Sequence, residues 1–273
     1  MQERLCMRNL CIFFLSAFIL CSCEELFEAH PYDGKITGET GMNAKNIARI
    51  VNNCAGKQQI RFIMMGDTQR WYDETEDFVS HINSRNDIDF VIHGGDISDF
   101  GLTKEMLWQR NILNKLKVPY VVLLGNHDCL ATGEQVFRKV FGDENFAFVA
   151  GNIRFVCLNT NSLEYDYSHP VPDFDFIDEQ LTAQATEEEK TIVVMHSPPF
   201  SDQFDNNIAP FFQEEIIKFS NLQFCLNAHE HRLEVKDRFK DGIIYYGSAN
   251  IEKRNYLLFT ITPNGYEREV VYF

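Results

Sequence analysis

The strongest constraint on this chain is a series of apolar runs that each end in polar residues of the kind that bind metal ions. The runs end at Gly66-Asp67-Thr68-Gln69, Gly94–Asp99, Gly125–Asp128, Met195–Ser197 and His229–His231. Short runs rich in branched side chains are typical of buried strands. In an α/β sheet, functional groups collect in the loops at the carboxyl ends of the strands. We therefore expect these five segments to meet at one rim of a sheet.

The rest of the pattern predicts an α/β chain that alternates between strands and helices. The expected strands are Ile60–Met65, Ile88–His93, Val118–Leu124, Thr191–Met195 and Leu222–Leu226, with a hairpin of Phe146–Val149 and Ile153–Leu158 and four closing strands at Leu233–Val235, Ile243–Tyr246, Tyr256–Ile261 and Arg268–Phe273. The expected helices are Phe78–Ile82, Leu102–Leu116, Phe174–Ala185 and Ile208–Phe219. Continuous apolar strands suit a sheet covered on both faces. We expect one domain over residues 57–273, preceded by a lead segment at residues 24–56.

The ligand types restrict the metal. Carboxylate and amide oxygens occur with imidazole nitrogens, and none of the five segments contributes a thiolate, so hard or borderline divalent ions are favoured. Each residue alone has an ordinary explanation: Asp67 or Asp96 could cap a helix, Asn126 could be a turn residue, and His196 could pack at a strand end. The ordered set of five favours the metal interpretation.

This ordered set resembles the calcineurin-like metallophosphoesterase superfamily. The resemblance lies in Asp67, Gly94-Gly95-Asp96 with Asp99, the Gly125–Asp128 segment, His196 and the His229–His231 segment. It implies a four-layer α/β/β/α sandwich with a dinuclear metal centre at the rim of the sheets. It also implies an enzyme, a phosphoric ester or diphosphate hydrolase.

The resemblance assigns roles residue by residue. The first metal site is expected to contain Asp67, Gln69, Asp96 and His231. The second is expected to contain Asp96, Asn126, His196 and His229, with Asp96 shared. His127 is expected to contact the phosphoryl group or the leaving group, with Asp128 holding it, and two ions would generate a bridging hydroxide for attack. Asp99 is expected to orient a ligand from behind.

Two positions depart from the family pattern. Ala228 stands where the pattern has glycine, which is a small steric change. Gln69 stands where the pattern has histidine, and a neutral amide oxygen is a weaker and harder ligand than imidazole. We therefore expect Mn²⁺ in preference to Mg²⁺, Fe or Zn²⁺. Glutamine at this position also resembles the Mn²⁺-dependent ADP-ribose/CDP-alcohol diphosphatase branch, although it can arise independently.

Two arginines follow the ligand segments and are candidate substrate contacts. Arg70 comes after Gln69, and Arg232 follows the last histidine. An arginine can bind a second phosphate through two parallel hydrogen bonds. The alternative is that Arg70 pairs with Asp73 or Glu74 on its own loop.

The N-terminus predicts export. Arg4 and Arg8 precede a short apolar stretch, Leu10–Leu20, which has the length of a secretory signal rather than of a membrane span. Leu20–Cys23 resembles a lipobox, so residues 1–23 are interpreted as a lipoprotein signal peptide with lipid on Cys23. An ordinary signal peptide or an uncleaved anchor is the alternative.

Charge and motifs together define the expected function. The net charge is −15, with 40 acidic and 25 basic residues, which argues against binding duplex nucleic acid. We expect an exported, lipid-anchored phosphohydrolase that faces outside the bacterial cytoplasm and acts on a small phosphorylated substrate, with the lipid as its membrane attachment. The alternatives are a metal-poor phosphate-binding lipoprotein without catalysis, and a cyclic-nucleotide or lipid-headgroup phosphodiesterase.

Overall fold

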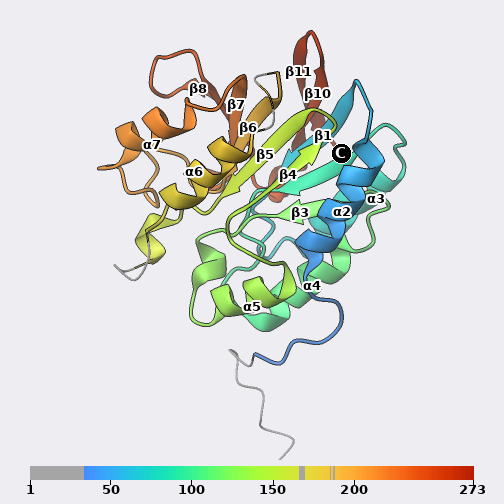
Figure 1. The fold of residues 1–273 in the computed structure, drawn as a ribbon. Helices are drawn as coiled ribbons and strands as arrows, with labels where there is room; N and C mark the ends of the chain where they lie inside the picture. The colour runs from blue at the N-terminus through green and yellow to red at the C-terminus, as the bar shows by residue number, and fades with distance from the viewer. Residues whose placement is uncertain (1–33, 166–169, 185, 187) are drawn as a thin grey trace, which may run out of the picture. The chain divides into compact units, whose positions relative to one another are not determined.

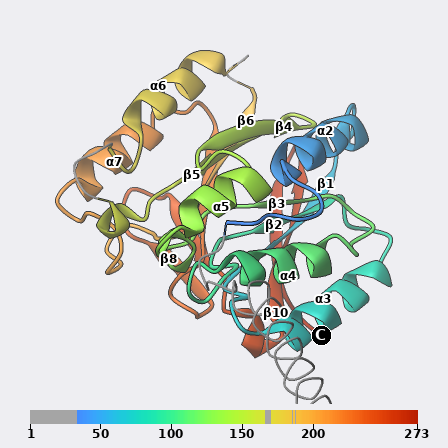
Figure 2. The ribbon, with the colours of Figure 1, turned by 90° about the horizontal axis from the view of Figure 1, so that it is seen from below.

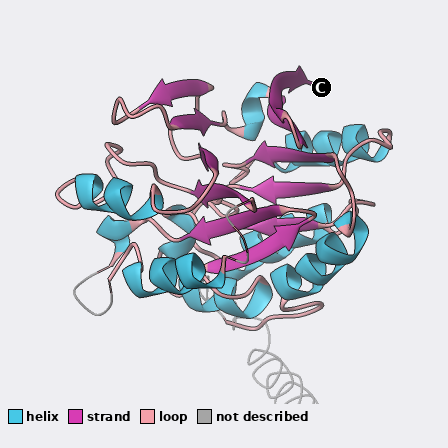
Figure 3. Cartoon of the chain, turned by 45° about the horizontal axis from the view of Figure 1, so that its top comes forward, coloured by secondary structure: helices cyan, strands magenta, loops and turns pink. Residues whose placement is uncertain are grey.

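Two β-sheets pack against each other, and each carries helices on its outer face (Figure 1, Figure 3). The computed structural model describes residues 34–165, 170–184, 186 and 188–273. The predicted signal peptide at residues 1–23, with its lipidation site Cys23, lies outside these residues. In the part of the chain that is described, no helix combines the length and the apolar character needed to cross a membrane.

The first sheet has the strand order β11-β10-β1-β2-β3. Its strands are β1 (Ile60–Met65), β2 (Phe90–His93), β3 (Tyr120–Val122), β10 (Asn255–Thr262) and β11 (Gly265–Tyr272). Strands β1, β2 and β3 are mutually parallel, so their carboxyl ends reach the same rim. Strand β10 runs antiparallel to β1 and forms a hairpin with β11.

The second sheet has the order β4-β5-β6-β7-β9-β8. Its strands are β4 (Phe146–Ala150), β5 (Ile153–Leu158), β6 (Lys190–Met195), β7 (Leu222–Asn227), β8 (Glu234–Asp237) and β9 (Ile244–Gly247). The predicted hairpin is present as the antiparallel pair β4 and β5. Strands β5, β6, β7 and β9 are parallel, which again brings carboxyl ends to one rim.

An aromatic core fills the space between the two sheets. Phe62 on β1 stacks on Phe90 and Phe259 of its own sheet and meets the edge of Phe155 from the other sheet, with ring centroids 5.0 Å apart. Phe224 of the second sheet stacks on Phe259 at 4.8 Å. Such ring pairs add to the free energy gained by burying large apolar side chains. This core fixes the position of one sheet against the other.

Helices cover the outer faces of both sheets. The helices α3 (Tyr72–Asn83), α4 (Thr103–Leu113) and α5 (Gly133–Val140) pack apolar residues on the first sheet. The helices α6 (Phe174–Ala183) and α7 (Ala209–Ile216) pack on the second. Figure 2 shows α6 and α7 on one side of the sheets and α3 and α4 on the other. Short 3₁₀ turns occupy His127–Cys129, Ser162–Glu164 and Ile251–Lys253.

The lead segment contains a helix that the sequence analysis did not predict. Helix α2 (Met42–Cys54) buries Met42, Asn46, Ile50 and Cys54, which follow one another at four-residue intervals and so share one face. Its Asn43 donates to the carbonyl of Val122 at 2.8 Å and accepts from the Val122 N–H at 2.9 Å. Asn43 thereby satisfies both backbone groups of a residue on β3, an edge strand of the first sheet.

The predicted fold class is confirmed: helices, two sheets and helices form the four layers α/β/β/α. Each predicted strand is present: Ile60–Met65 and Ile153–Leu158 have the predicted ends, and the others differ at one or both ends. Helices α2 and α5 were not predicted.

Candidate metal centre

The five ligand segments meet at the rim where the parallel strands of both sheets end. Asp67, Asp96 and Asn126 follow strands β1, β2 and β3 of the first sheet. His196 follows β6 and the His229–His231 segment follows β7 of the second sheet. The prediction that distant segments converge is confirmed by their interatomic distances.

The four residues predicted for the second metal site have their ligand atoms in contact. Asn126 Oδ1 lies 3.0 Å from His196 Nε2 and 3.0 Å from His229 Nδ1. His196 Nε2 lies 3.4 Å from Asp96 Oδ1. A shared cation is a natural occupant of such a cluster, because it attracts the lone pairs of all four groups.

The residues predicted for the first site lie beside this cluster. Asp67 Oδ1 lies 3.4 Å from His231 Nε2 and accepts from the His229 backbone N–H at 3.3 Å. Gln69 Nε2 donates to Asp96 Oδ2 at 3.2 Å. The amide nitrogen therefore faces Asp96, and a ligand role for Gln69 requires the half-turn that exchanges its nitrogen and oxygen.

The residues fit a divalent ion. Asp67 Oδ2 is buried and has no hydrogen-bond partner among the described residues. Asp67, Asp96 and His196 are buried, and one ligand atom of each lies within 4.8 Å of the others. A buried carboxylate oxygen without a partner is costly unless a cation balances it. This trio is a candidate divalent metal site.

The backbone at the centre is strained. Asp67, Asp96, His229 and His231 have φ of 52°, 56°, 70° and 51°, a left-handed conformation that non-glycine residues seldom adopt. Each such residue costs about 1–3 kcal/mol, and such residues cluster at active sites and ligand clamps. The surrounding core must hold these turns in place.

Two glycines make the close approach possible. A Cβ on Gly95 would lie 2.7 Å from His196 Nδ1, and one on Gly125 would lie 2.2 Å from Asp96 Oδ1. Gly95 also has a φ of +103°, which side-chain-bearing residues rarely adopt. Larger residues at these positions would displace the candidate ligands. Ala228 fits at its position, because its methyl group is buried and lies beside Gly66 and Gly94, which have no side chains.

Asp96 and His196, which lie side by side in the centre, shift each other's pKa. Burial alone would raise the pKa of Asp96 and lower that of His196, yet their mutual attraction reverses both shifts: the pKa of Asp96 is lowered and that of His196 is raised. Burial and the nearby His196 lower the pKa of His93 to about 3. His93 is a buried residue that contacts Thr68 Oγ1 at 2.9 Å, so its role is in packing the loop.

The predicted contact between Asp128 and His127 is wrong. His127 Nδ1 lies 2.7 Å from the Asp99 carbonyl oxygen, which fixes its ring instead. Asp128 is fully buried and accepts from the backbone N–H groups of Gly125 and Ser98 at 2.9 and 2.8 Å. The pKa of Asp128 is raised to about 6, mainly by burial and to a smaller extent by repulsion from Asp96. Asp128 therefore stabilises the two ligand loops from behind.

The sequence predicts that the Asp99 carboxylate orients a ligand. In the structure this carboxylate instead accepts a hydrogen bond from Arg70. The Arg70 guanidinium donates to Asp99 Oδ1 at 2.6 Å. Glu105 at the start of α4 accepts from the N–H groups of Asp99 and Phe100 at 3.2 and 3.0 Å. The loop that carries Asp99 is thus fixed from its other side.

Neither candidate substrate arginine is without a partner. Arg70 pairs with Asp99, which replaces the alternative pairing with Asp73 or Glu74. Arg232 donates to Glu230 and Glu234 at 2.7 and 3.2 Å. Both arginine side chains are 61% exposed, so their guanidinium groups remain in contact with solvent.

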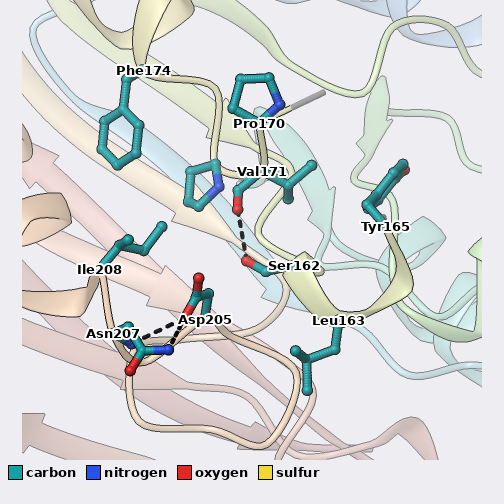
Figure 4. Close-up of a pocket in the computed structure, with 10 residues that line it drawn as sticks. Ser162, Leu163, Tyr165, Pro170, Val171, Phe174, Asp205, Asn207 and Ile208 are labelled. Atoms are coloured by element: carbon teal, nitrogen blue, oxygen red, sulfur yellow. Dashed lines mark hydrogen bonds between the residues drawn. The ribbon is translucent and has the colours of Figure 1, made fainter. Parts of the chain in front are cut away.

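The loop after His196 contributes to the lining of two hollows. One, of about 470 Å³, is lined by Asp96, Asn126, His127, His229 and His231 together with Phe200–Gln203. A second, of about 730 Å³, is lined mainly by residues 162–165, 170–174 and 205–208. Figure 4 shows its walls tied by hydrogen bonds, from Ser162 to the Val171 carbonyl and from Asn207 to Asp205.

Sequence reasoning missed one polar residue at the centre. Asp202 Oδ1 lies 2.6 Å from His229 Nε2. Asp202 follows no strand and sits in no recurring motif, so the sequence carries no signal for it.

Comparison with known proteins identifies the class that the fold and the site define. The sequence model of the calcineurin-like phosphoesterase family matches residues 60–233. The chain belongs to this family, which confirms the predicted class, a metallophosphoesterase. The family typically binds divalent metals, in agreement with the candidate site.

Individual relatives agree with this assignment. A 3',5'-cyclic-nucleotide phosphodiesterase of Nostoc sp. is 26% identical over 173 residues, which are 61% of this chain and 64% of that protein. This chain thus matches less than two thirds of that relative. A dimetal phosphatase from Danio rerio has a TM-score of 0.62 at 12% identity, covering 77% of this chain and 98% of its own. A purple acid phosphatase from yellow lupin has a TM-score of 0.59 at 13% identity, covering 79% and 52%. The two structures show a shared fold.

Proposed function

We propose that the protein is a metal-dependent phosphodiesterase that holds two divalent ions, with Mn²⁺ preferred. The observation that carries the metal assignment is the buried Asp67 Oδ2 beside Asp96 and His196, which has no hydrogen-bond partner in the part of the chain that the structure describes. Asp67, Gln69, Asp96 and His231 are the proposed residues of one site. Asp96, Asn126, His196 and His229 are those of the other. When bound, such ions neutralise phosphoryl charge and activate water as a nucleophile.

The protein's own groups bind the substrate and supply a proton. His127 lines the hollow, and its side chain is 37% exposed, so Nε2 is open to a substrate while Nδ1 is held by the Asp99 carbonyl. In its imidazolium form His127 carries a hydrogen on each nitrogen: Nδ1–H donates to the Asp99 carbonyl, and Nε2–H can donate to a phosphoryl oxygen or pass its proton to the leaving oxygen. Asp99 and Glu105 hold the loop, and Asp128 keeps the shape of the turn.

Two observations support a diester in preference to a diphosphate. The relative from Nostoc is named for cyclic nucleotides. A second phosphate would be bound by Arg70 and Arg232. Each of these arginines is paired with a carboxylate instead. A substrate with one phosphate needs neither arginine. A nucleotide diphosphatase is the second candidate, favoured by Gln69.

The test is reconstitution of the full chain. The metal-free protein is loaded with Mn²⁺, Mg²⁺ or Zn²⁺ and assayed with cyclic nucleotides, linear diesters, monoesters and ADP-ribose. We expect Mn²⁺-dependent turnover with the highest kcat/KM for a diester. Higher kcat/KM for ADP-ribose would overturn the diester assignment and leave the family intact.

Variants test the site itself. Asp96→Ala and Asn126→Ala should reduce turnover to background, because each removes a proposed ligand. His81→Ala is the control, since His81 lies on α3 and contacts Tyr256 at 3.1 Å. Normal turnover by Asp96→Ala would contradict the proposed mechanism.

Export and lipid attachment are part of the proposal. They rest on the basic and apolar N-terminus and on Leu20–Cys23. Metabolic labelling with a fatty acid should mark the wild type and not Cys23→Ser. Equal labelling of both would refute acylation at Cys23.

A further inference from the structure

We infer that Asp202 is a positioning residue that fixes the orientation and tautomer of His229, so that His229 Nδ1 faces the metal centre. The inference rests on the proposed function, in which His229 is a metal ligand. It adds a residue from outside the five ligand segments.

The contact is short and specific. His229 Nε2 lies 2.6 Å from Asp202 Oδ1, whereas Nδ1 of the same ring lies 3.0 Å from Asn126 Oδ1. The two ring nitrogens therefore face opposite partners. Asp202 lies on the solvent side, and Asn126 lies in the metal cluster.

The Asp202 carboxylate determines which nitrogen of the His229 ring carries the hydrogen. A neutral imidazole has one N–H, and a carboxylate accepts it more strongly than an amide oxygen does. The hydrogen therefore sits on Nε2 toward Asp202. Nδ1 then presents its lone pair beside the lone pairs of Asn126 Oδ1. Two lone pairs at 3.0 Å repel, and a cation between them turns the repulsion into binding.

The ring is also held from its other end. The His229 backbone has a φ of 70°, and its N–H donates to Asp67 Oδ1 at 3.3 Å. The backbone fixes where the ring starts, and Asp202 fixes its rotation. A metal-ligating histidine whose second nitrogen donates to a carboxylate has both its tautomer and its direction determined.

Asp202 is 86% exposed, so its position must come from its loop. Phe200 N donates to Asn206 Oδ1 at 2.7 Å, and Asn206 Nδ2 donates back to the Ser201 carbonyl at 2.8 Å. These bonds close the loop on itself around Asp202.

Neighbouring elements anchor the same loop. The buried Arg238 donates to the Pro199 carbonyl at 2.8 Å. Leu163 N donates to the Gln203 carbonyl at 3.3 Å. The loop is thus fixed on both sides of Asp202, and an exposed carboxylate acquires a defined position.

The test measures metal binding by the full chain. Co²⁺ is titrated into metal-free protein, and the bound ions are followed by visible absorption and by calorimetry. Asp202→Ala should weaken the ion that depends on His229 by about 10- to 100-fold, with the lower end favoured by the exposure of Asp202. Asp202→Asn retains an acceptor oxygen and should recover part of the loss.

Controls separate positioning from damage to the loop. Asp205→Ala removes another carboxylate of the same loop, one that accepts from Asn207 N and Nδ2 at 3.0 and 2.9 Å, and should leave Co²⁺ affinity unchanged. His229→Ala should lose the same ion that Asp202→Ala weakens.

The outcomes are distinct. Wild-type affinity in Asp202→Ala, with His229→Ala defective, would overturn the positioning role while the proposed function stands. Equal weakening in Asp205→Ala, or no recovery in Asp202→Asn, would assign the effect to the loop and also overturn it. Unchanged Co²⁺ binding in His229→Ala would overturn both this inference and the proposed ligand set.

Discussion

Gln69 is the residue at which this chain departs furthest from its family's pattern. It is almost fully buried, has a φ of 28° and donates to Asp96 Oδ2. The amide can therefore act in two ways. It can stabilise the Asp96 carboxylate through its nitrogen, or it can turn and offer its oxygen to a cation. In the second role Gln69 contributes a neutral oxygen, which is a harder ligand than imidazole.

Gln69→His should tighten metal binding and shift the preference toward Zn²⁺, because imidazole is the stronger ligand for borderline ions. Calorimetric titration of the full chain with Mn²⁺ and Zn²⁺ measures both effects. Gln58→His, which adds a histidine at an exposed position before β1, at the opposite end of that strand from the Asp67 loop, is the matched control. Equal affinities in wild type and Gln69→His would show that residue 69 is not a ligand.

For single residues, the sequence predicted which side chains come together at the candidate metal centre. It did not predict the hydrogen bonds that hold them in position. The ligands were predictable because each follows a strand, and parallel strands deliver their carboxyl ends to one rim. Asp128 was assigned to His127 because they are neighbours in the sequence. In the 3₁₀ turn, however, the carboxylate of Asp128 points toward backbone N–H groups. Asp202 depends on the closure of a loop, which no local pattern encodes.

At the scale of elements, a buried carboxylate joins α5 to the second sheet. Glu144, between α5 and β4, accepts from Arg138 Nε at 2.6 Å, from Asn159 Nδ2 at 2.9 Å and from Tyr165 at 3.2 Å. Burial would raise the pKa of Glu144, but the hydrogen bonds from Asn159 and Arg138 outweigh it and hold the pKa below 4.5. Glu144 therefore stabilises the fold in its charged form.

Glu144→Gln should lower the free energy of unfolding by about 1–3 kcal/mol at neutral pH, because it replaces a charged acceptor with a neutral one. The folded-state pKa is depressed, so the wild-type advantage is complete above pH 4.5 and is lost as the pH falls through the folded-state value. Urea unfolding of both proteins from pH 7 down to pH 3.5 measures the difference. A difference that stays constant with pH would contradict the assignment to charge.

Helices were less predictable than strands for a physical reason. Strands such as β2 and β5 are buried on both faces and appear as continuous apolar runs. Helix α2 has five buried positions among polar residues, and only the four-residue spacing of Met42, Asn46, Ile50 and Cys54 identifies it. Helix α5 is shorter still. Its Val136, Phe137 and Val140 are buried by packing against the first sheet, which the local sequence does not reveal. Tertiary packing supplies most of the stability of such short helices.

At the scale of the whole molecule, the metal centre connects the two sheets. Asp67, Asp96 and Asn126 come from one sheet, and His196, His229 and His231 come from the other. Each proposed site takes ligands from both sheets, so an ion bound at either site favours the packed arrangement over any state in which the sheets separate. Ligand binding to the native state alone raises the free energy of unfolding.

Mn²⁺ should therefore raise Tm, and a chelator should lower it. A metal concentration 100-fold above Kd stabilises the fold by about 2.7 kcal/mol for one site, which corresponds to several degrees for a chain of this size. Differential scanning calorimetry of the wild type with and without Mn²⁺ measures the shift. Asn126→Ala should show a smaller rise, and a full rise in that variant would contradict the proposed ligand set.

Asn43 has a consequence for how molecules of this protein behave toward one another. A strand at the edge of a sheet offers unpaired N–H and C=O groups to which a second chain can add. On β3, the Asn43 side chain already occupies both groups of Val122. Helix α2 thus blocks edge-to-edge aggregation through β3. Its loss would leave the backbone groups of Val122 unpaired, so that a strand of a second molecule could add to the edge of the first sheet.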